Sequence, residues 1–366
     1  MTLTQKRFIT LLIVILAGAV PGRLAVRAAL NLLIGGTLFG GEFPMIKEQT
    51  KRKGRVKWAV IYIGAFLAAF AASALFKMTY SPLSGLTRVD WNDSIGRVYT
   101  DLPYGDGPAN KFDLYVPADN TRQTYGLVVY LHAGGFTAGD KSGDAEILQW
   151  LCAKGYVAAG INYTLTSEEN PQANIYTQSV DIRDSIPFVV AEAEKLGYHL
   201  DRMAVAGGSA GHCLAMLYAY RDAPTSPLPV KLVFGAVGPS SFYPEDWGVF
   251  GFGQNPDAAA VMFSVMSGKP VTPDLFGTPA YGEIIKDISA VSWIDETSVP
   301  SLLAYGAHDK VQPFDASKRL DATLTQYGVP HDYIVFPHSG HGLQNDDRQA
   351  RLYYEKINEY LEQYLN

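Results

Sequence analysis

Gly207-Gly208-Ser209-Ala210-Gly211 stands between an apolar run, residues 203–206, and a helix-like stretch, residues 212–220. A serine on a tight turn from strand to helix projects its hydroxyl above the edge of a sheet. Glycines beside it allow the strained backbone and the close approach that a larger side chain would block. The N–H of Ala210 would then point from a helix N-terminus, where a negatively charged oxygen is stabilised. Ser209 is therefore the candidate nucleophile.

Two downstream turns carry an acid and a base. Asp309 lies just past an apolar run, residues 301–305, and His341 lies in a turn after another short run, residues 333–336. In a serine triad the histidine takes the serine proton, and the carboxylate holds the imidazolium in the right tautomer. The order Ser, Asp, His along the chain is that of the α/β-hydrolases, not of the chymotrypsin-like or subtilisin-like enzymes. Asp309 and His341 are therefore the candidate partners of Ser209.

A third turn lies upstream of the serine. Residues 127–131 form a buried-strand signal that runs directly into His132-Ala133-Gly134-Gly135-Phe136. Glycine amides in such a loop can face the negative charge that develops on a carbonyl oxygen during acyl transfer. Gly134, Gly135 and Ala210 are the candidate oxyanion hole.

With these three turns the chain resembles the hormone-sensitive-lipase-like and BD-FAE-type carboxylesterases of the α/β-hydrolase superfamily, from about residue 98 onward. Similar short signatures stand at Tyr104-Gly105, Asp113-Leu-Tyr115-Val-Pro117, Gly139-Asp140-Lys141, Asn162-Tyr163 and Asp201-Arg202. The resemblance implies an α/β-hydrolase fold, a mostly parallel central sheet flanked by helices with a cap insertion. The alternation of strand-like and helical runs favours the same fold class. The implied reaction is hydrolysis of a carboxylic ester through an acyl-enzyme. No zinc-like spacing is present, so we expect no metal and no other cofactor.

Two residues depart from the family pattern. Ala133 replaces the first glycine of the oxyanion loop, which is harmless only if that residue keeps an ordinary φ. His212 replaces a second glycine after the serine turn, and we expect it on the helix surface or in the pocket wall. His132 and Asp140 are expected to brace the oxyanion loop rather than to touch substrate.

Other residues compete for the roles of base and acid. His338 is the rival base, but His341 precedes Gly342 in the turn where the family keeps its base. Asp315 is the rival acid, but it falls inside a predicted helix after Pro313, where a surface carboxylate is expected.

The alternation of strands and helices breaks after residues 231–237, and residues 239–298 are predicted to form a cap over the nucleophile. A connection of this length is more often functional than idle. Its aromatic and Met side chains, among them Met262, Phe263 and Met266, either hold an acyl or aryl group or form the cap's own small core. The candidate substrate-pocket residues are Phe136, His212, Phe242 and Trp247.

The N-terminal part has a different composition. Apolar stretches cover residues 8–22, 28–41 and 58–76, and the last of these is uncharged and long enough to cross a hydrocarbon core of ~30 Å. Residues 47–57 carry six basic side chains against one acid, so the positive-inside rule predicts a cytoplasmic loop there. We expect residues 1–77 to form a membrane anchor with two or three hydrophobic segments, and the catalytic domain to lie on the extracytoplasmic side.

The remaining boundaries follow from this division. Residues 78–95 are predicted to be a linker, and residues 96–366 the α/β-hydrolase catalytic domain with its cap at 239–298. Residues 1–77 have a net charge of +9. Because the whole chain has a net charge of −6, residues 78–366 carry −15. A domain with that charge has no broad attraction for nucleic acid. Cys152 and Cys213, the two cysteines, do not make a disulfide framework.

The expected partner is a small-molecule ester with an acyl, aryl or carbohydrate group. Three other functions remain open. A serine peptidase of the prolyl-oligopeptidase type shares the order of the triad but generally has a large additional domain. An acyltransferase could use the same serine. A non-catalytic binding module of this fold usually loses members of the triad, whereas all three residue types are present here.

Overall fold

The central sheet is built from short apolar runs, as expected for strands that are covered on both faces. The computed structural model describes residues 85–250 and 254–366, which belong to one compact unit. Its strands are β1 (Gly96–Pro103), β2 (Lys111–Pro117), β3 (Tyr125–Leu131), β4 (Val157–Ile161), β5 (Leu200–Gly208), β6 (Val230–Ala236), β7 (Ser301–Gly306) and β8 (His331–Phe336). Every residue of β4 and β7 is buried, and so is all but one of β3.

The strand order places β5 inside the sheet. The order is β1-β2-β4-β3-β5-β6-β7-β8. β1 pairs antiparallel with β2, and β2 pairs antiparallel with β4, whereas all other neighbours are parallel. The carboxyl ends of β3, β5, β6, β7 and β8 therefore lie at one edge, where ligands of open α/β sheets bind.

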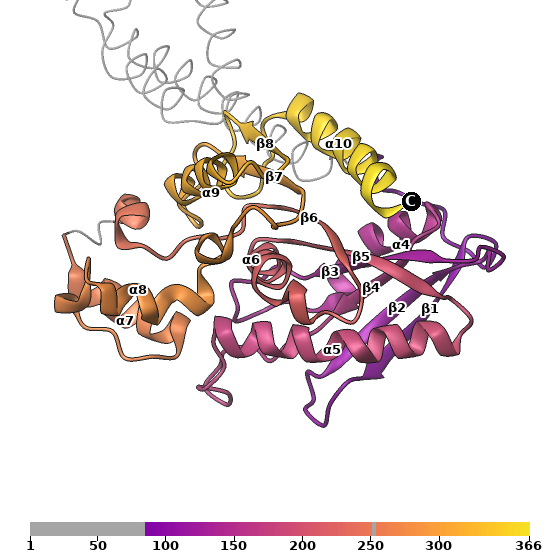
Figure 1. Cartoon of the computed structure of the whole chain (residues 1–366), viewed down its shortest axis with the longest axis horizontal. Helices are drawn as coiled ribbons and strands as arrows, with labels where there is room; N and C mark the ends of the chain where they lie inside the picture. The colour runs from indigo at the N-terminus through magenta and orange to yellow at the C-terminus, as the bar shows by residue number, and fades with distance from the viewer. Residues whose placement is uncertain (1–84, 251–253) are drawn as a thin grey trace, which may run out of the picture. The chain divides into compact units, whose positions relative to one another are not determined.

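Helices cover both faces of the sheet (Figure 1). One face packs against α4 (Ala145–Ala153) and α10 (Asp347–Leu365), and the other against α5 (Ile175–Lys195), α6 (Ala210–Leu217) and α9 (Phe314–Gln326). Apolar side chains of the two faces accordingly form two separate core clusters.

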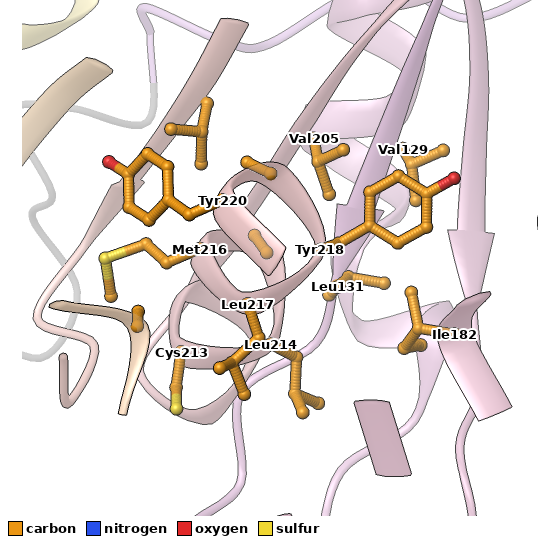
Figure 2. Close-up of a cluster of buried hydrophobic side chains, with 14 of the residues drawn as sticks. Val129, Leu131, Ile182, Val205, Cys213, Leu214, Met216, Leu217, Tyr218 and Tyr220 are labelled. Atoms are coloured by element: carbon orange, nitrogen blue, oxygen red, sulfur yellow. The ribbon is translucent and has the colours of Figure 1, made fainter. Parts of the chain in front are cut away.

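Helix α6 follows β5 and is buried on every side. All eight of its residues are buried, as expected for a helix that, apart from His212, is apolar on every face. Figure 2 shows its side chains beside Val129 and Leu131 of β3, Val205 of β5 and Ile182 of α5. This packing fixes the helix that begins directly after Ser209.

The connection between β6 and β7 contains the predicted insertion. It includes η4 (Pro244–Phe250), α7 (Pro256–Ser267), η5 (Pro273–Leu275), α8 (Pro279–Ile285), η6 (Lys286–Ile288) and η7 (Ala290–Trp293). Figure 1 shows α7 and α8 apart from the helices that cover the sheet. The insertion nevertheless joins the core of the α5–α6 face, to which it contributes Phe242, Phe263 and Tyr281.

The predicted membrane anchor, residues 1–77, and the first part of the predicted linker, residues 78–84, lie outside the described residues. Within 85–250 and 254–366, the structure has no helix with the length and apolarity that a membrane crossing requires.

Candidate active site

Ser209 lies between the end of β5 and the start of α6 in a strained conformation. Its φ is 51° and its ψ is −119°, a region that few residues other than glycine adopt. A Cβ at Gly207 would lie 2.5 Å from the carbonyl carbon of Gly211, and a Cβ at Gly211 would lie 1.9 Å from the carbonyl oxygen of Leu131. The backbone of the turn is held by the Ser209 N–H, which donates to the carbonyl of Ala236 at 2.8 Å. Gly207 and Gly211 are thus required by close contact, whereas a Cβ at Gly208 would meet only the Tyr130 hydroxyl, at 3.9 Å.

The structure brings Ser209, Asp309 and His341 into one hydrogen-bonded chain. Nε2 of His341 lies 2.8 Å from Oγ of Ser209, and its Nδ1 lies 2.7 Å from Oδ2 of Asp309. The other oxygen of Asp309 accepts the backbone N–H groups of Val311 at 2.7 Å and Gln312 at 3.0 Å. Because an ionised carboxylate only accepts, Nδ1 carries the proton and Nε2 is left to accept from the serine hydroxyl. Asp309 is 5% exposed, so solvent does not compete for this arrangement.

The rival base and acid lie in other settings. Nδ1 of His338 is 2.8 Å from Asp346, and the imidazole of His338 is 77% exposed. Asp315 lies on α9, where it pairs with Lys318 across one helical turn at 2.8 Å, and both side chains are largely exposed. Neither rival takes part in the chain that reaches Ser209.

The loop after β3 has the backbone that its glycines suggest. Gly134 and Gly135 have φ values of 138° and 60°, and Phe136 has a φ of 68°. Ala133 is not among the described residues with positive φ, so an alanine fits there without strain. Gly135 lines the cavity above Ser209, as does Ala210, whereas the carbonyl of Gly134 closes a turn by accepting the N–H of residues 137 and 138. Of the three candidate oxyanion donors, Gly135 and Ala210 therefore border the cavity and Gly134 shapes the loop.

His132 stabilises this loop through contacts of its ring and of its backbone carbonyl. Its ring stacks on Tyr163 with centroids 4.3 Å apart and planes 8° from parallel, and its Nδ1 lies 2.8 Å from the carbonyl of Ala133. The Tyr163 hydroxyl donates to the carbonyl of His132 at 2.9 Å. Burial lowers the pKa of His132, so the ring is an uncharged support.

A polar network anchors the far end of the same loop. Asp140 accepts the N–H of Ser142 at 2.9 Å and the side-chain amide of Asn162 at 2.7 Å. Partial burial alone would raise the pKa of Asp140, but these hydrogen bonds lower it to about 2. Lys141 is buried and forms ion pairs with Asp101 at 2.8 Å and Asp113 at 3.1 Å.

A cavity of about 250 Å³ opens above Ser209. Its lining is mostly apolar and contains Gly135, Phe136, Ser209, Ala210, Pro239, Trp247, Met262, Met266, Val311, Gln312 and His341. No Asp, Glu, Lys or Arg side chain of the described residues belongs to this lining. Two of the four predicted pocket residues, Phe136 and Trp247, belong to this lining, as do Met262 and Met266 of the insertion. The cavity suits an uncharged, largely apolar group.

The other two predicted pocket residues lie behind the cavity. His212 is fully buried, and burial lowers its pKa to about 3, so it is a neutral core residue and not a surface or wall residue. The expectation that His212 lies on the helix surface or in the pocket wall is wrong, because other parts of the fold enclose α6 on all sides. Phe242 is also fully buried, and its ring stacks on that of Trp247 at 5.5 Å. The tryptophan faces the cavity and the phenylalanine supports it.

The backbone of Gly238 hydrogen-bonds to three side chains from different elements of the fold. Its N–H donates to Nδ1 of His212 at 3.2 Å, and its carbonyl accepts from the Tyr305 hydroxyl at 2.8 Å and from Nε2 of Gln312 at 3.3 Å. The preceding residue, Val237, has a φ of 51°, which a β-branched residue seldom adopts. These three bonds hold a strained turn at the entry to the insertion.

Pro239, Val311 and Gln312 line the cavity although the sequence reasoning did not single them out. Val311 and Gln312 directly follow Asp309, and a loop that carries the acid toward the histidine must border the site. The position of Val311 and Gln312 directly after Asp309 was the signal that could have identified them as cavity residues. Nothing comparable marks Pro239, whose position depends on the turn at Gly238.

The fold and the arrangement of these residues are those of an α/β-hydrolase, with Ser209 on the turn from β5 to α6. Residues 112–324 match the BD-FAE family model, which is more than half of the chain, and the chain therefore belongs to the BD-FAE family. The predicted fold class is thereby confirmed for the described part of the chain.

Several relatives of the chain are esterases by name. It is 24% identical over 294 residues to a probable isoprenylcysteine α-carbonyl methylesterase of Oryza sativa subsp. japonica, which covers 76% of this chain and 67% of the rice protein. It is 26% identical over 254 residues to LipM, a probable carboxylic ester hydrolase of Mycobacterium tuberculosis, covering 66% of this chain but only 56% of LipM. An inhibited esterase B from Lactobacillus rhamnosis has the same fold, with a TM-score of 0.57, 19% identity and coverage of 86% of this chain and 96% of the esterase. These matches place the chain among the carboxylic ester hydrolases.

Proposed function

We propose that this protein is a serine carboxylesterase that cleaves neutral esters through an acyl-enzyme. The observation that carries the proposal is the continuous chain from Ser209 through His341 to Asp309, which opens on an uncharged cavity. The family and its esterase relatives support the same reaction class.

The mechanism assigns a step to each group. His341 takes the proton of Ser209 as the hydroxyl attacks the ester carbonyl, and Asp309 stabilises the imidazolium that forms. The backbone amides of Ala210 and of the oxyanion loop, foremost Gly135, stabilise the tetrahedral oxyanion. The imidazolium then protonates the departing alcohol. Water, activated by the same histidine, hydrolyses the acyl-enzyme and regenerates the serine.

The cavity supports a substrate class. Because its lining is mostly apolar and carries no Asp, Glu, Lys or Arg side chain among the described residues, an uncharged acyl or aryl group enters without leaving a buried charge unpaired. A carbohydrate ester fits the proposal if its acyl group occupies the cavity and the sugar lies at the opening.

The test is hydrolysis of p-nitrophenyl esters from acetate to decanoate by the purified full-length chain in detergent. Ser209→Ala and His341→Ala should each lower kcat by about 10⁴-fold or more, since the triad acts as a unit. His338→Ala is the matched control, because this exposed histidine lies three residues from the base and should leave turnover within about twofold of wild type. Retained turnover in Ser209→Ala would refute the proposal.

Two other activities are distinguished by product and substrate. Cleavage of peptides in preference to esters would indicate a peptidase, and transfer of the acyl group to an added alcohol in preference to water would indicate an acyltransferase. Folded wild-type protein that turns over no substrate would favour a binding module.

The membrane anchor is a separate part of the proposal and rests on the sequence of residues 1–77, above all on the uncharged stretch 58–76. We expect the full chain to remain with membranes after alkaline extraction and the catalytic domain to be digested by protease added outside the cell. Release by alkali would refute the anchor. Protection from external protease would refute the predicted orientation.

A further inference from the structure

Trp247, a wall of the cavity, is held by its own segment of the insertion. Its indole N–H donates to the carbonyl of Ser241 at 2.8 Å. The hydroxyl of Ser241 in turn donates to Oδ2 of Asp246 at 2.5 Å. Beside the ring contacts of Trp247 with Phe242 and Phe263, the position of the indole in the cavity therefore depends on where Ser241 and Asp246 are held.

Asp246 is held from outside the insertion. It is 6% exposed, and Arg319 on α9 meets it with two nitrogens, Nε at 2.5 Å from Oδ2 and Nη2 at 3.0 Å from Oδ1. The same guanidinium reaches Glu245 at 3.1 Å and lies 4.9 Å from the centre of the Tyr243 ring. A planar, doubly hydrogen-bonded pair of this kind fixes orientation as well as distance.

The pair joins the cavity wall to the helix that follows the acid. Helix α9 begins at Phe314, two residues after Gln312. No contact described for Arg319 reaches Ser209, His341 or the lining of the cavity, so its influence on substrate passes through Asp246.

The rest of the insertion has independent supports. The N–H of Phe242 donates to the hydroxyl of Ser289 at 3.2 Å, and its carbonyl accepts from the hydroxyl of Tyr281 at 2.6 Å. Loss of Arg319 would leave these bonds in place and would loosen residues 243–246, since a buried carboxylate without its cation moves toward water. Trp247 would keep its ring contacts with Phe242 and Phe263, while the constraint that reaches it through Ser241 would weaken.

We propose that Arg319 is a positioning residue that sets acyl-length preference, by fixing Trp247 against the acyl group through Asp246 and Ser241. The inference rests on the proposed esterase function and deepens it. An acyl group long enough to touch the indole loses that contact when the pair is broken, whereas an acetyl group bound close to Ser209 does not reach it.

The experiment compares kcat/KM for p-nitrophenyl octanoate and acetate in full-length wild type, Arg319→Met, Asp246→Asn and the double variant. The octanoate-to-acetate ratio should fall about tenfold in each single variant, the size expected for a lost apolar contact in a pocket. The double variant should fall no further, because both substitutions break the same pair. Arg319→Lys should recover part of the ratio, since lysine keeps the charge but not the second hydrogen bond.

Arg202→Met is the matched control. Arg202 also makes a two-nitrogen pair, with Asp201 at 3.0 and 2.8 Å, but that pair lies at the start of β5, far along the strand from Ser209. Its loss should leave the ratio unchanged. Urea unfolding of each variant identifies those that are folded at the assay temperature, and only folded variants are compared.

An octanoate-to-acetate ratio within twofold of wild type in folded Arg319→Met and Asp246→Asn would overturn the inference, as would a rise in the ratio or an equal fall in Arg202→Met. Failure of the esterase proposal has a different signature. Wild type itself would then show no turnover that depends on Ser209, and no ratio could be formed.

Discussion

Replacing Gly211 by alanine tests whether α6 sits as tightly on β3 as the structure shows. The residue lies in a helix and its φ is not positive, so helix propensity alone predicts that alanine stabilises by about 1 kcal/mol. The close contacts predict the opposite. A Cβ there would lie 1.9 Å from the carbonyl oxygen of Leu131, 2.5 Å from its carbonyl carbon and 2.7 Å from the carbonyl oxygen of His132.

The size of the effect follows from those distances. Ordinary contact begins near 3.4 Å, so α6 must retreat by about 1.5 Å from backbone atoms that belong to the central sheet. Overpacking of this kind costs about 1–3 kcal/mol, which exceeds the gain in helix propensity. The retreat also carries Ser209 and the Ala210 amide away from His341, and a misplacement of 1 Å can lower the rate by about 100-fold.

The assay is kcat/KM for a p-nitrophenyl ester together with thermal unfolding. We expect Gly211→Ala to lose about two orders of magnitude in kcat/KM and a few degrees in Tm. Gly143→Ala is the control, because its Cβ would meet no atom within 4 Å and its φ is not positive. A Gly211→Ala protein with wild-type Tm and kcat/KM within about threefold would show that the helix does not pack on β3 as described.

Substitutions at three residues probe buried polar groups, each followed by urea unfolding. His212→Leu leaves the N–H of Gly238 without its acceptor and should lower the free energy of unfolding by about 1–3 kcal/mol. His212→Asn supplies an oxygen in the place of Nδ1 and should lower it by less. Equal losses in the two variants would refute the role of His212 as the acceptor for Gly238. Burial raises the pKa of Asp144 to about 7, so the wild type should lose stability between about pH 4 and pH 7, as the unfolded chain releases this proton before the folded one does. Asp144→Asn should be more stable than wild type at pH 8 and equal to it at pH 4, and a pH-independent difference would contradict the assignment. Lys141→Met leaves the carboxylate of Asp113 buried without a cation and should cost about 3 kcal/mol, and a neutral effect would show that the carboxylate finds water.

The fold and the candidate triad could be predicted because their signals are local. A serine between glycines, after an apolar run and before a helix, specifies its own turn, and the acid and base each follow a strand directly. The parallel sheet then brings the ends of β5, β7 and β8 to one edge, where His341 lies within hydrogen-bond distance of both Ser209 and Asp309.

The pocket could be predicted only in part, because its walls are selected by tertiary packing. Phe242 and Trp247 are both aromatic and five residues apart, and nothing in their spacing tells which one faces substrate. Bonds from Ser289 and Tyr281, some 40 residues downstream, turn the backbone of Phe242 inward. His212 was misplaced for a similar reason, since a single helical turn after the serine does not reveal that other elements enclose it.

The edge position of β8 has a consequence for a chain that is still being synthesised. Within the described sheet β8 pairs only with β7, and His341 follows it, so the histidine is the last of the three candidate catalytic residues to be made. In a growing chain Ser209 is therefore made well before the candidate base. Under the proposed mechanism, Ser209 has no base until β8 has paired with β7 and the loop that carries His341 is in place.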